Sequence, residues 1–125
     1  MKKTYSMKYN RDFKRLYSKG NCVHGAYLVM YYKRANITCN ILGITVTKKL
    51  GKAHIRNRCR RLIKESYRLK EENIGSGYYI VFVARSRMVG LSYEQISRDM
   101  NFLLKKSGII KERTDAQNGS PALGQ

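Results

Sequence analysis

Hydrophobic residues recur along this chain with two periods, and the period predicts which segments are helices and which are strands. Near the start, Phe13 and Tyr17 recur at helical spacing. Asn10 is a suitable N-cap for this helix, and Gly20 is a suitable end. Residues 1–8 are basic and show no period, so we expect them to form an arm rather than a regular element.

Three apolar runs predict strands. Residues 22–34 contain AYLVMYY and residues 38–47 contain CNILGITVT, both rich in β-branched and aromatic types, with a short link between them. Residues 78–84, YYIVFVA, form the continuous apolar run typical of a buried strand. Alternate side chains of a strand share a face, so Tyr27 and Tyr31 should lie together on one side of the sheet. We expect one side of the sheet to pack a helix and the other to remain partly open.

A last helix is marked by its cap. Ser92 and Gln95 have the spacing of a capping box, and Gly108 should end the helix. An apolar stripe at helical spacing predicts that this helix packs against a core. The stripe consists of Ile96, Met100, Leu103 and Leu104. Residues 114–125 are polar and aperiodic, so we expect a disordered tail after a single domain over residues 1–113.

The most unusual segment covers residues 48–70, KKLGKAHIRNRCRRLIKESYRLK. It holds ten Lys or Arg and one acid, a balance of +9 that is half of the chain's +18. In a helix its apolar positions fall within one sector, formed by Ile55, Cys59, Leu62, Ser66 and Leu69 and flanked by Ile63 and Tyr67. The other side carries Arg56, Arg60, Lys64 and Arg68 at i, i+4 spacing, with Asn57 and Arg61 beside them.

This charge pattern favours a helix that binds a polyanion. Like charges at i, i+4 spacing destabilise a helix by about 0.2–0.5 kcal/mol per pair. A solvated helical face normally interleaves Glu with Lys, and Glu65 is the only acid within this helix's basic rows. Lys48, Lys49 and Lys52 precede the helix, where its N-terminal N–H groups also favour phosphate.

Composition narrows the class of protein. A chain of 125 residues with 42% hydrophobic content can bury one real core, and a net charge of +18 is typical of a nucleic-acid binder. No apolar run approaches the roughly 20 residues of a membrane-spanning helix, and no signal sequence opens the chain. We therefore expect a cytoplasmic protein with no membrane partner. Cys22, Cys39 and Cys59 lack zinc spacing, so we expect reduced, structural thiols.

Patterns for catalysis are scarce. The two histidines and eight acids form no Ser/His/Asp spacing and no paired-carboxylate site, and the chain has no P-loop. We expect no catalytic residue and no metal held by the protein alone. The tyrosine face of the sheet, if open, could instead stack unpaired bases at about 1–3 kcal/mol per base. Core packing is the alternative for those tyrosines and for Phe13 and Tyr17.

A family resemblance rests on the basic segment. Residues 45–68, TVTKKLGKAHIRNRCRRLIKESYR, resemble the signature region of the protein subunit of bacterial ribonuclease P, and DFKRLYSKG, LVMYY and YYIVFVAR extend the likeness over about residues 5–108. The resemblance implies a single-domain α+β sandwich in the order helix-strand-strand-(strand)-helix-strand-helix. That fold is similar to the second domain of ribosomal protein S5 and has a left-handed crossover through the basic helix.

The resemblance also implies residue roles. In the family the basic helix binds the catalytic RNA, and the matching positions here are Arg56, Asn57, Arg58, Arg60, Arg61, Lys64 and Arg68. A cleft between the first helix and the sheet receives the single-stranded 5′ leader of precursor tRNA. Its matching positions are Phe13, Tyr17 and Tyr31. Lys48 and Lys49 match basic positions near the substrate, and we assign Lys52 to leader binding with them. Lys64 stands where relatives often carry Arg, which keeps the charge but loses the bidentate fork.

The implied function is that of a protein cofactor of the ribonuclease P ribozyme, with one protein per RNA, in the 5′ maturation of tRNA. Hydrolysis would then be carried out by Mg²⁺ ions bound to the RNA subunit. The alternative is a ribosomal or other structural RNA-binding protein without a role in cleavage, which composition does not separate from a ribozyme cofactor. A DNA-binding protein is less favoured, because the sequence shows neither a helix-turn-helix pair nor a dimer seam.

Overall fold

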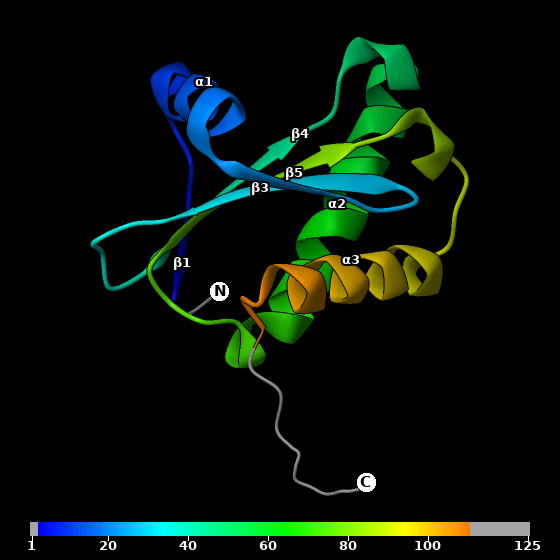
Figure 1. Cartoon of the computed structure of the whole chain (residues 1–125). Helices are drawn as coiled ribbons and strands as arrows, with labels where there is room; N and C mark the ends of the chain where they lie inside the picture. The colour runs from blue at the N-terminus through cyan, green and yellow to red at the C-terminus, as the bar shows by residue number, and fades with distance from the viewer. Residues whose placement is uncertain (1–2, 111–125) are drawn as a thin grey trace, which may run out of the picture.

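One mixed sheet of five strands runs through the computed structural model, which describes residues 3–110 (Figure 1). In the order in which they lie side by side, the strands are β1 (Thr4–Ser6), β4 (Asn40–Thr45), β5 (Tyr78–Ala84), β3 (Leu28–Arg34) and β2 (Asn21–His24). Strands β1 and β5 run parallel to β4, whereas β3 is antiparallel to both β5 and β2. The tail expected over residues 114–125 lies outside the described residues.

The helices divide between the two faces of the sheet (Figure 1). Helix α1 (Asn10–Lys19) covers one face, and α2 (Ala53–Lys70) and α3 (Tyr93–Ser107) cover the other. Single-turn 3-10 helices occupy Lys48–Leu50, Glu71–Asn73 and Ser86–Met88. Helix α2 connects the parallel neighbours β4 and β5. The predicted α+β fold, with the basic segment as a helix between strands, is confirmed.

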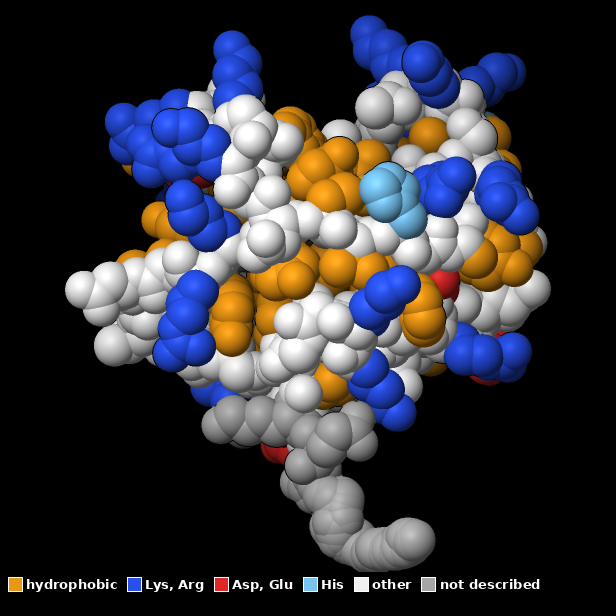
Figure 2. Space-filling view, in the orientation of Figure 1, with side chains coloured by type: hydrophobic (Ala, Val, Ile, Leu, Met, Phe, Trp, Pro, Cys, Tyr) orange, Lys and Arg blue, Asp and Glu red, His pale blue; other side chains and the backbone are white. Residues whose placement is uncertain are grey.

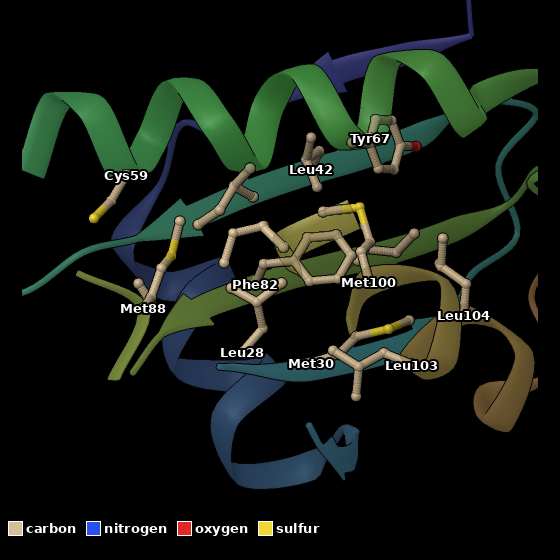
Figure 3. Close-up of a cluster of buried hydrophobic side chains, with 14 of the residues drawn as sticks. Leu28, Met30, Leu42, Cys59, Tyr67, Phe82, Met88, Met100, Leu103 and Leu104 are labelled. Carbon is tan, nitrogen blue, oxygen red and sulfur yellow. The ribbon is translucent and has the colours of Figure 1, made fainter. Parts of the chain in front are cut away.

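The main core lies between the sheet and the pair α2 and α3 (Figure 3). Leu28, Met30 and Phe82 from the sheet are fully buried. Tyr67 from α2 meets the Phe82 ring at its edge, with centroids 6.4 Å apart, and Met100 from α3 is also fully buried. Each such side chain contributes about 1.5–3 kcal/mol on burial. Together they fix the rotation of α2, and with it the direction in which its cations point.

The opposite face of the sheet has a smaller core. Leu16 from α1 and Val81 from β5 are buried there, and Phe13 and Tyr31 are only partly buried beside them. Because α1 has 10 residues and is the single α-helix that the described chain places on this face, part of the face stays open. The sequence predicted such a half-covered sheet, and the prediction is confirmed.

The cap of α3 is confirmed in detail. The Gln95 backbone N–H donates to the Ser92 hydroxyl over 3.3 Å, and the Ser92 backbone N–H donates to Gln95 Oε1 over 3.0 Å. Gly108 ends the helix at a φ of 81°, a left-handed conformation that favours glycine. The predicted stripe from Ile96 to Leu104 is fully buried at each of its four positions.

The expectation of an irregular N-terminal arm over residues 1–8 was wrong for Thr4–Ser6. Thr4–Ser6 form β1, parallel to β4 with Thr4 opposite Asn40. The Thr4 hydroxyl is hydrogen-bonded to the Tyr67 hydroxyl over 2.8 Å. A strand of three residues is too short to show a period, and its partner lies far along the chain, so no local pattern could reveal it. Asn10 is likewise the first helical residue, and Tyr9 is the N-cap.

The buried face of α2 is rotated from the predicted one. Leu69, placed in the apolar sector, is 57% exposed, whereas Tyr67, placed at its margin, is fully buried. The Tyr67 hydroxyl finds hydrogen-bond partners inside the protein, so the whole ring can leave water without an unpaired polar group. Position on the helical wheel alone does not contain that information.

The predicted strand over residues 22–34 is split into β2 and β3 by a turn. The Asp99 carboxylate, on α3, accepts the backbone N–H groups of Ala26, Tyr27 and Leu28 over 2.9–3.0 Å. Tyr27 consequently packs against the main core, whereas Tyr31 packs on the opposite face of the sheet. The prediction that the two tyrosines share a face was wrong. An acid in the middle of a helix gave no sign of this long-range bond.

Among residues 3–110, no helix has the length and apolar character needed to cross a membrane.

One stability prediction follows from the core. Ser66 is fully buried on α2, and its hydroxyl has no hydrogen-bond partner within residues 3–110. Ser66→Ala should therefore raise the free energy of unfolding by about 1 kcal/mol, because it removes a hydroxyl that folding takes out of water without giving it a hydrogen bond. Tyr67→Phe, which removes a bonded hydroxyl, should lower it by about 1–2 kcal/mol. Urea unfolding of the two variants measures both changes, and a destabilised Ser66→Ala chain would contradict the assignment.

Candidate nucleic-acid interface

A cleft of about 480 Å³ lies between α1 and α2, over the second half of β4. Strand β1 pairs with β4 only as far as Leu42, so it leaves the next residues of that strand edge uncovered. The lining residues come from four elements and the link after β1. They are Ser6, Met7, Phe13, Leu42, Gly43, Ile44, Asn57, Arg60, Arg61 and Lys64. The cleft therefore brings together residues of the two groups that the sequence assigned to RNA.

Gly43 forms the floor of the cleft beneath α1. A Cβ atom at this position would lie 2.6 Å from Cε1 of the Phe13 ring, closer than real Cβ atoms come to their neighbours. The missing side chain is what lets the ring lie directly on the strand. Sequence analysis did not identify Gly43, although a glycine in the middle of an apolar strand is a signal of close approach.

The aromatic wall begins with Phe13, which lines the cleft, and continues with the rings of Tyr17 and Tyr31, which lie beside Phe13 and are not among the lining residues. The Tyr17 ring stands edge-on to Tyr31 with centroids 4.9 Å apart and lies 6.4 Å from Phe13. Its hydroxyl is hydrogen-bonded to the Thr45 hydroxyl over 2.7 Å. Tyr17 is 39% exposed, whereas Phe13 and Tyr31 are partly buried. Burial raises the pKa of the Tyr31 phenol, and the neighbouring Cys22 raises it further.

The cationic wall is a face of α2. Asn57, Arg60, Arg61 and Lys64 line the cleft with exposed side chains. No carboxylate is among the lining residues. Figure 2 shows Lys and Arg side chains over α1 and over the beginning of α2, with hydrophobic side chains in the hollow between them. Phosphate oxygens in this cleft would therefore meet several cations and no competing acid.

The other predicted cations of α2 point elsewhere. Arg56 donates from Nε to the Gly51 carbonyl over 3.2 Å and is partly buried. Arg58 donates from Nη1 to the Leu91 carbonyl over 3.4 Å, on the flank that faces the loop before α3.

Arg68 is engaged by an acid. Its Nη2 atom lies 2.7 Å from Oε2 of Glu65, and the hydrogen bond from Arg68 lowers the pKa of that carboxyl. The guanidinium is thus already paired within the helix. The seven residues predicted on one basic helix are therefore divided among the cleft, the opposite flank, a backbone contact and an ion pair.

The three predicted lysines flank α2 at its start. Lys48 and Lys49 belong to the 3-10 turn over Lys48–Leu50, and Lys52 is the N-cap of α2; all three side chains are exposed. None of them is among the residues that line the cleft. Within residues 3–110, no cluster of His, Cys, Asp and Glu has the arrangement of a metal site.

The comparisons with known proteins agree on one family. The family model described as ribonuclease P matches residues 1–108. The ribonuclease P protein component of Caldanaerobacter subterraneus is 38% identical over 111 residues, covering 89% of this chain and 96% of the relative, and that of Clostridium botulinum is 44% identical over 101 residues, covering 80% and 91%. The solved structure of the Staphylococcus aureus RNase P protein superposes with a TM-score of 0.79 at 32% identity, covering 86% of this chain and 98% of that one.

The cleft predicts an anion effect on stability. Sulfate held between Arg60, Arg61 and Lys64 relieves their repulsion only in the folded chain, so sulfate should raise the Tm more than chloride at matched ionic strength. Sulfate also strengthens apolar burial in every protein, and the comparison must therefore be made between variants.

Arg61→Ala should lose part of the excess that sulfate gives over chloride. The double variant Glu65→Gln with Arg68→Ala is the matched control, because it removes a cation that is already paired and the acid that pairs it. It should keep the full excess. Thermal unfolding of the three proteins in the two salts decides the matter, and equal excesses would rule out an organised anion site in the cleft.

Proposed function

Because this chain belongs to the ribonuclease P protein family, we propose that it is the protein cofactor of the ribonuclease P ribozyme, an endoribonuclease that matures the 5′ end of tRNA. Its partners are then the catalytic RNA, one protein per RNA, and precursor tRNA. With these partners it works in the cytoplasm. The single observation that carries the molecular part of the proposal is the cleft between the cations of α2 and Phe13, with the Tyr17 and Tyr31 rings next to Phe13.

The aromatic wall supports binding of the single-stranded 5′ leader. Unpaired bases expose π faces, and each base stacked on an aromatic side chain contributes about 1–3 kcal/mol. Tyr17 presents the most accessible ring of the three, and Phe13 lies on the floor strand next to the cations. Bases of a leader in the cleft would meet these rings, while its phosphates would meet Arg60 and Arg61.

The cations of α2 support binding of the catalytic RNA. Arg58 points away from the cleft, toward the loop before α3, so the two flanks of the helix can meet different strands of RNA. Lys48, Lys49 and Lys52 extend the positive surface from the start of α2. A phosphate contact releases condensed counterions, which is why such a surface binds RNA strongly at low salt.

Catalysis belongs to the RNA in this proposal. The side chains that line the cleft include no His, Asp, Glu, Cys or Tyr, the residues that most often act as general bases. Mg²⁺ ions held by the RNA subunit would activate the water and stabilise the leaving oxygen. The protein supplies position: it holds the leader against the helix that also contacts the catalytic RNA.

The proposed function is tested by cleavage. At a Mg²⁺ concentration where a bacterial ribonuclease P RNA alone is slow, adding this chain should accelerate cleavage of precursor tRNA. The Lys and Arg side chains of the bound protein reduce the repulsion between the two RNAs. The readout is the initial rate of 5′ leader release. If the chain binds the RNA but leaves the rate unchanged, the alternative of a structural RNA-binding protein takes first place.

The aromatic wall is tested by a pair of substitutions at one position. Tyr17→Leu removes the ring, so it should weaken binding of precursor tRNA to the reconstituted enzyme about 5-fold to 150-fold, the equivalent of about 1–3 kcal/mol. Tyr17→Phe removes only the hydroxyl bonded to Thr45 and should change the affinity little. Mature tRNA, which has no leader, should bind both variants equally well. Equal losses for precursor and mature tRNA would show that this ring supports the fold and not the leader.

A further inference from the structure

A second hollow surface lies on the other flank of α1. Helix α1 rests on the sheet through the buried Leu16, with Phe13 and Tyr17 on the cleft side. The opposite flank borders two adjoining hollows, of about 530 and 240 Å³, that share Asp12, Arg15 and Tyr79. Together they reach from β1 to the end of β3. Neither the motifs of the sequence nor the proposed function assigns a role to this surface.

Exposed aromatic rings are the first unusual property of this surface. Tyr5 is 63% exposed and Tyr9 is 58% exposed, although both are large and partly apolar. The Arg11 guanidinium lies over the Tyr9 ring, 5.0 Å from its centroid. The faces of these rings contribute little to packing, because most of their area is in water. Rings beside cations are the combination that single-strand-binding surfaces use.

Charge is the second property. The two hollows are lined by the five cations Lys8, Arg11, Arg15, Lys33 and Arg34, and by the single acid Asp12. Arg11 and Arg15 are one helical turn apart on α1, and like charges at that spacing repel each other. A phosphate backbone would complement this surface as it complements the cleft.

Continuity is the third property. Ser6, at the end of β1, lines both the cleft and the larger of the two hollows. A single strand that leaves the cleft past Ser6 therefore enters the hollow that Tyr5 and Tyr9 line. The whole path then borders α1.

We propose that the surface formed by Tyr5, Tyr9, Arg11 and Arg15 binds single-stranded RNA, namely the part of the 5′ leader that lies upstream of the part in the cleft. The inference rests on the proposed function. Long leaders then make two sets of contacts with the protein, one in the cleft and one on this surface, whereas short leaders fill the cleft alone.

The experiment compares two precursor tRNAs in the reconstituted enzyme, one with a leader of about 4 nucleotides and one with about 14, the range over which single-strand-binding domains differ. The double variant Tyr5→Leu with Tyr9→Leu should weaken binding of the long-leader substrate about 5-fold or more, and leave the short-leader substrate unchanged. Arg11→Gln with Arg15→Gln should do the same and reduce the salt dependence of long-leader binding only.

Phe102→Leu is the matched control. Phe102 is also an exposed aromatic with a cation over its ring, Lys106 at 5.5 Å, but it lies on α3 on the other face of the sheet. It should leave both substrates unaffected. Thermal unfolding checks that the double variants are folded, and the arginine pair repeats the test without touching a ring.

Three results would overturn the proposal: no loss for the long leader, equal losses for both leaders, or weaker binding of the catalytic RNA in the absence of substrate. The last would assign the surface to the RNA subunit instead. Failure of the proposed function looks different, because the wild-type enzyme would then bind the short-leader substrate no better than mature tRNA.

Discussion

A buried hydrogen-bond network around the Tyr67 hydroxyl ties together the elements that shape the cleft. This hydroxyl bonds to Thr4 of β1 and accepts from Nδ2 of Asn40, at the start of β4. Asn40 in turn donates to the Gly75 carbonyl and accepts the Tyr78 backbone N–H at the start of β5. Burial raises the pKa of the Tyr67 phenol, so the group stays protonated and can donate as well as accept. One network thus positions α2 and the first residues of three strands.

The position of the cleft follows from that network. Because β1 is held beside the first half of β4, it stops at the level of Leu42 and leaves the following edge open. Because Tyr67 and Cys59 of α2 face the core, Arg60, Arg61 and Lys64 turn toward that open edge. The cations are costly for the fold on their own, since they repel one another. Packing on the far side of the helix offsets the cost and keeps them exposed.

The sequence predicted elements better than it predicted neighbours. Strand β5 and the cap of α3 depend on local composition and spacing, and both agree with prediction. Strand β1 depends on a partner far along the chain, and the turn after β2 depends on Asp99. For the cleft, residue types indicated aromatic and cationic groups. Gly43 signals a close approach but does not show that the Phe13 ring is what approaches, and the i, i+3 spacing of Glu65 and Arg68 permits their ion pair without requiring it.

The two walls of the cleft have different physical roles. Phosphates are present in every RNA, single-stranded or paired, so the cationic wall would provide affinity without much choice of partner. A ring such as Tyr17 can stack only on a base whose face is free, and paired bases already stack on each other. Salt screens the first kind of contact and hardly affects the second. A cleft that had cations alone would hold leader and tRNA body alike. The aromatic wall, made possible by a glycine in β4, is what would let it select the single strand.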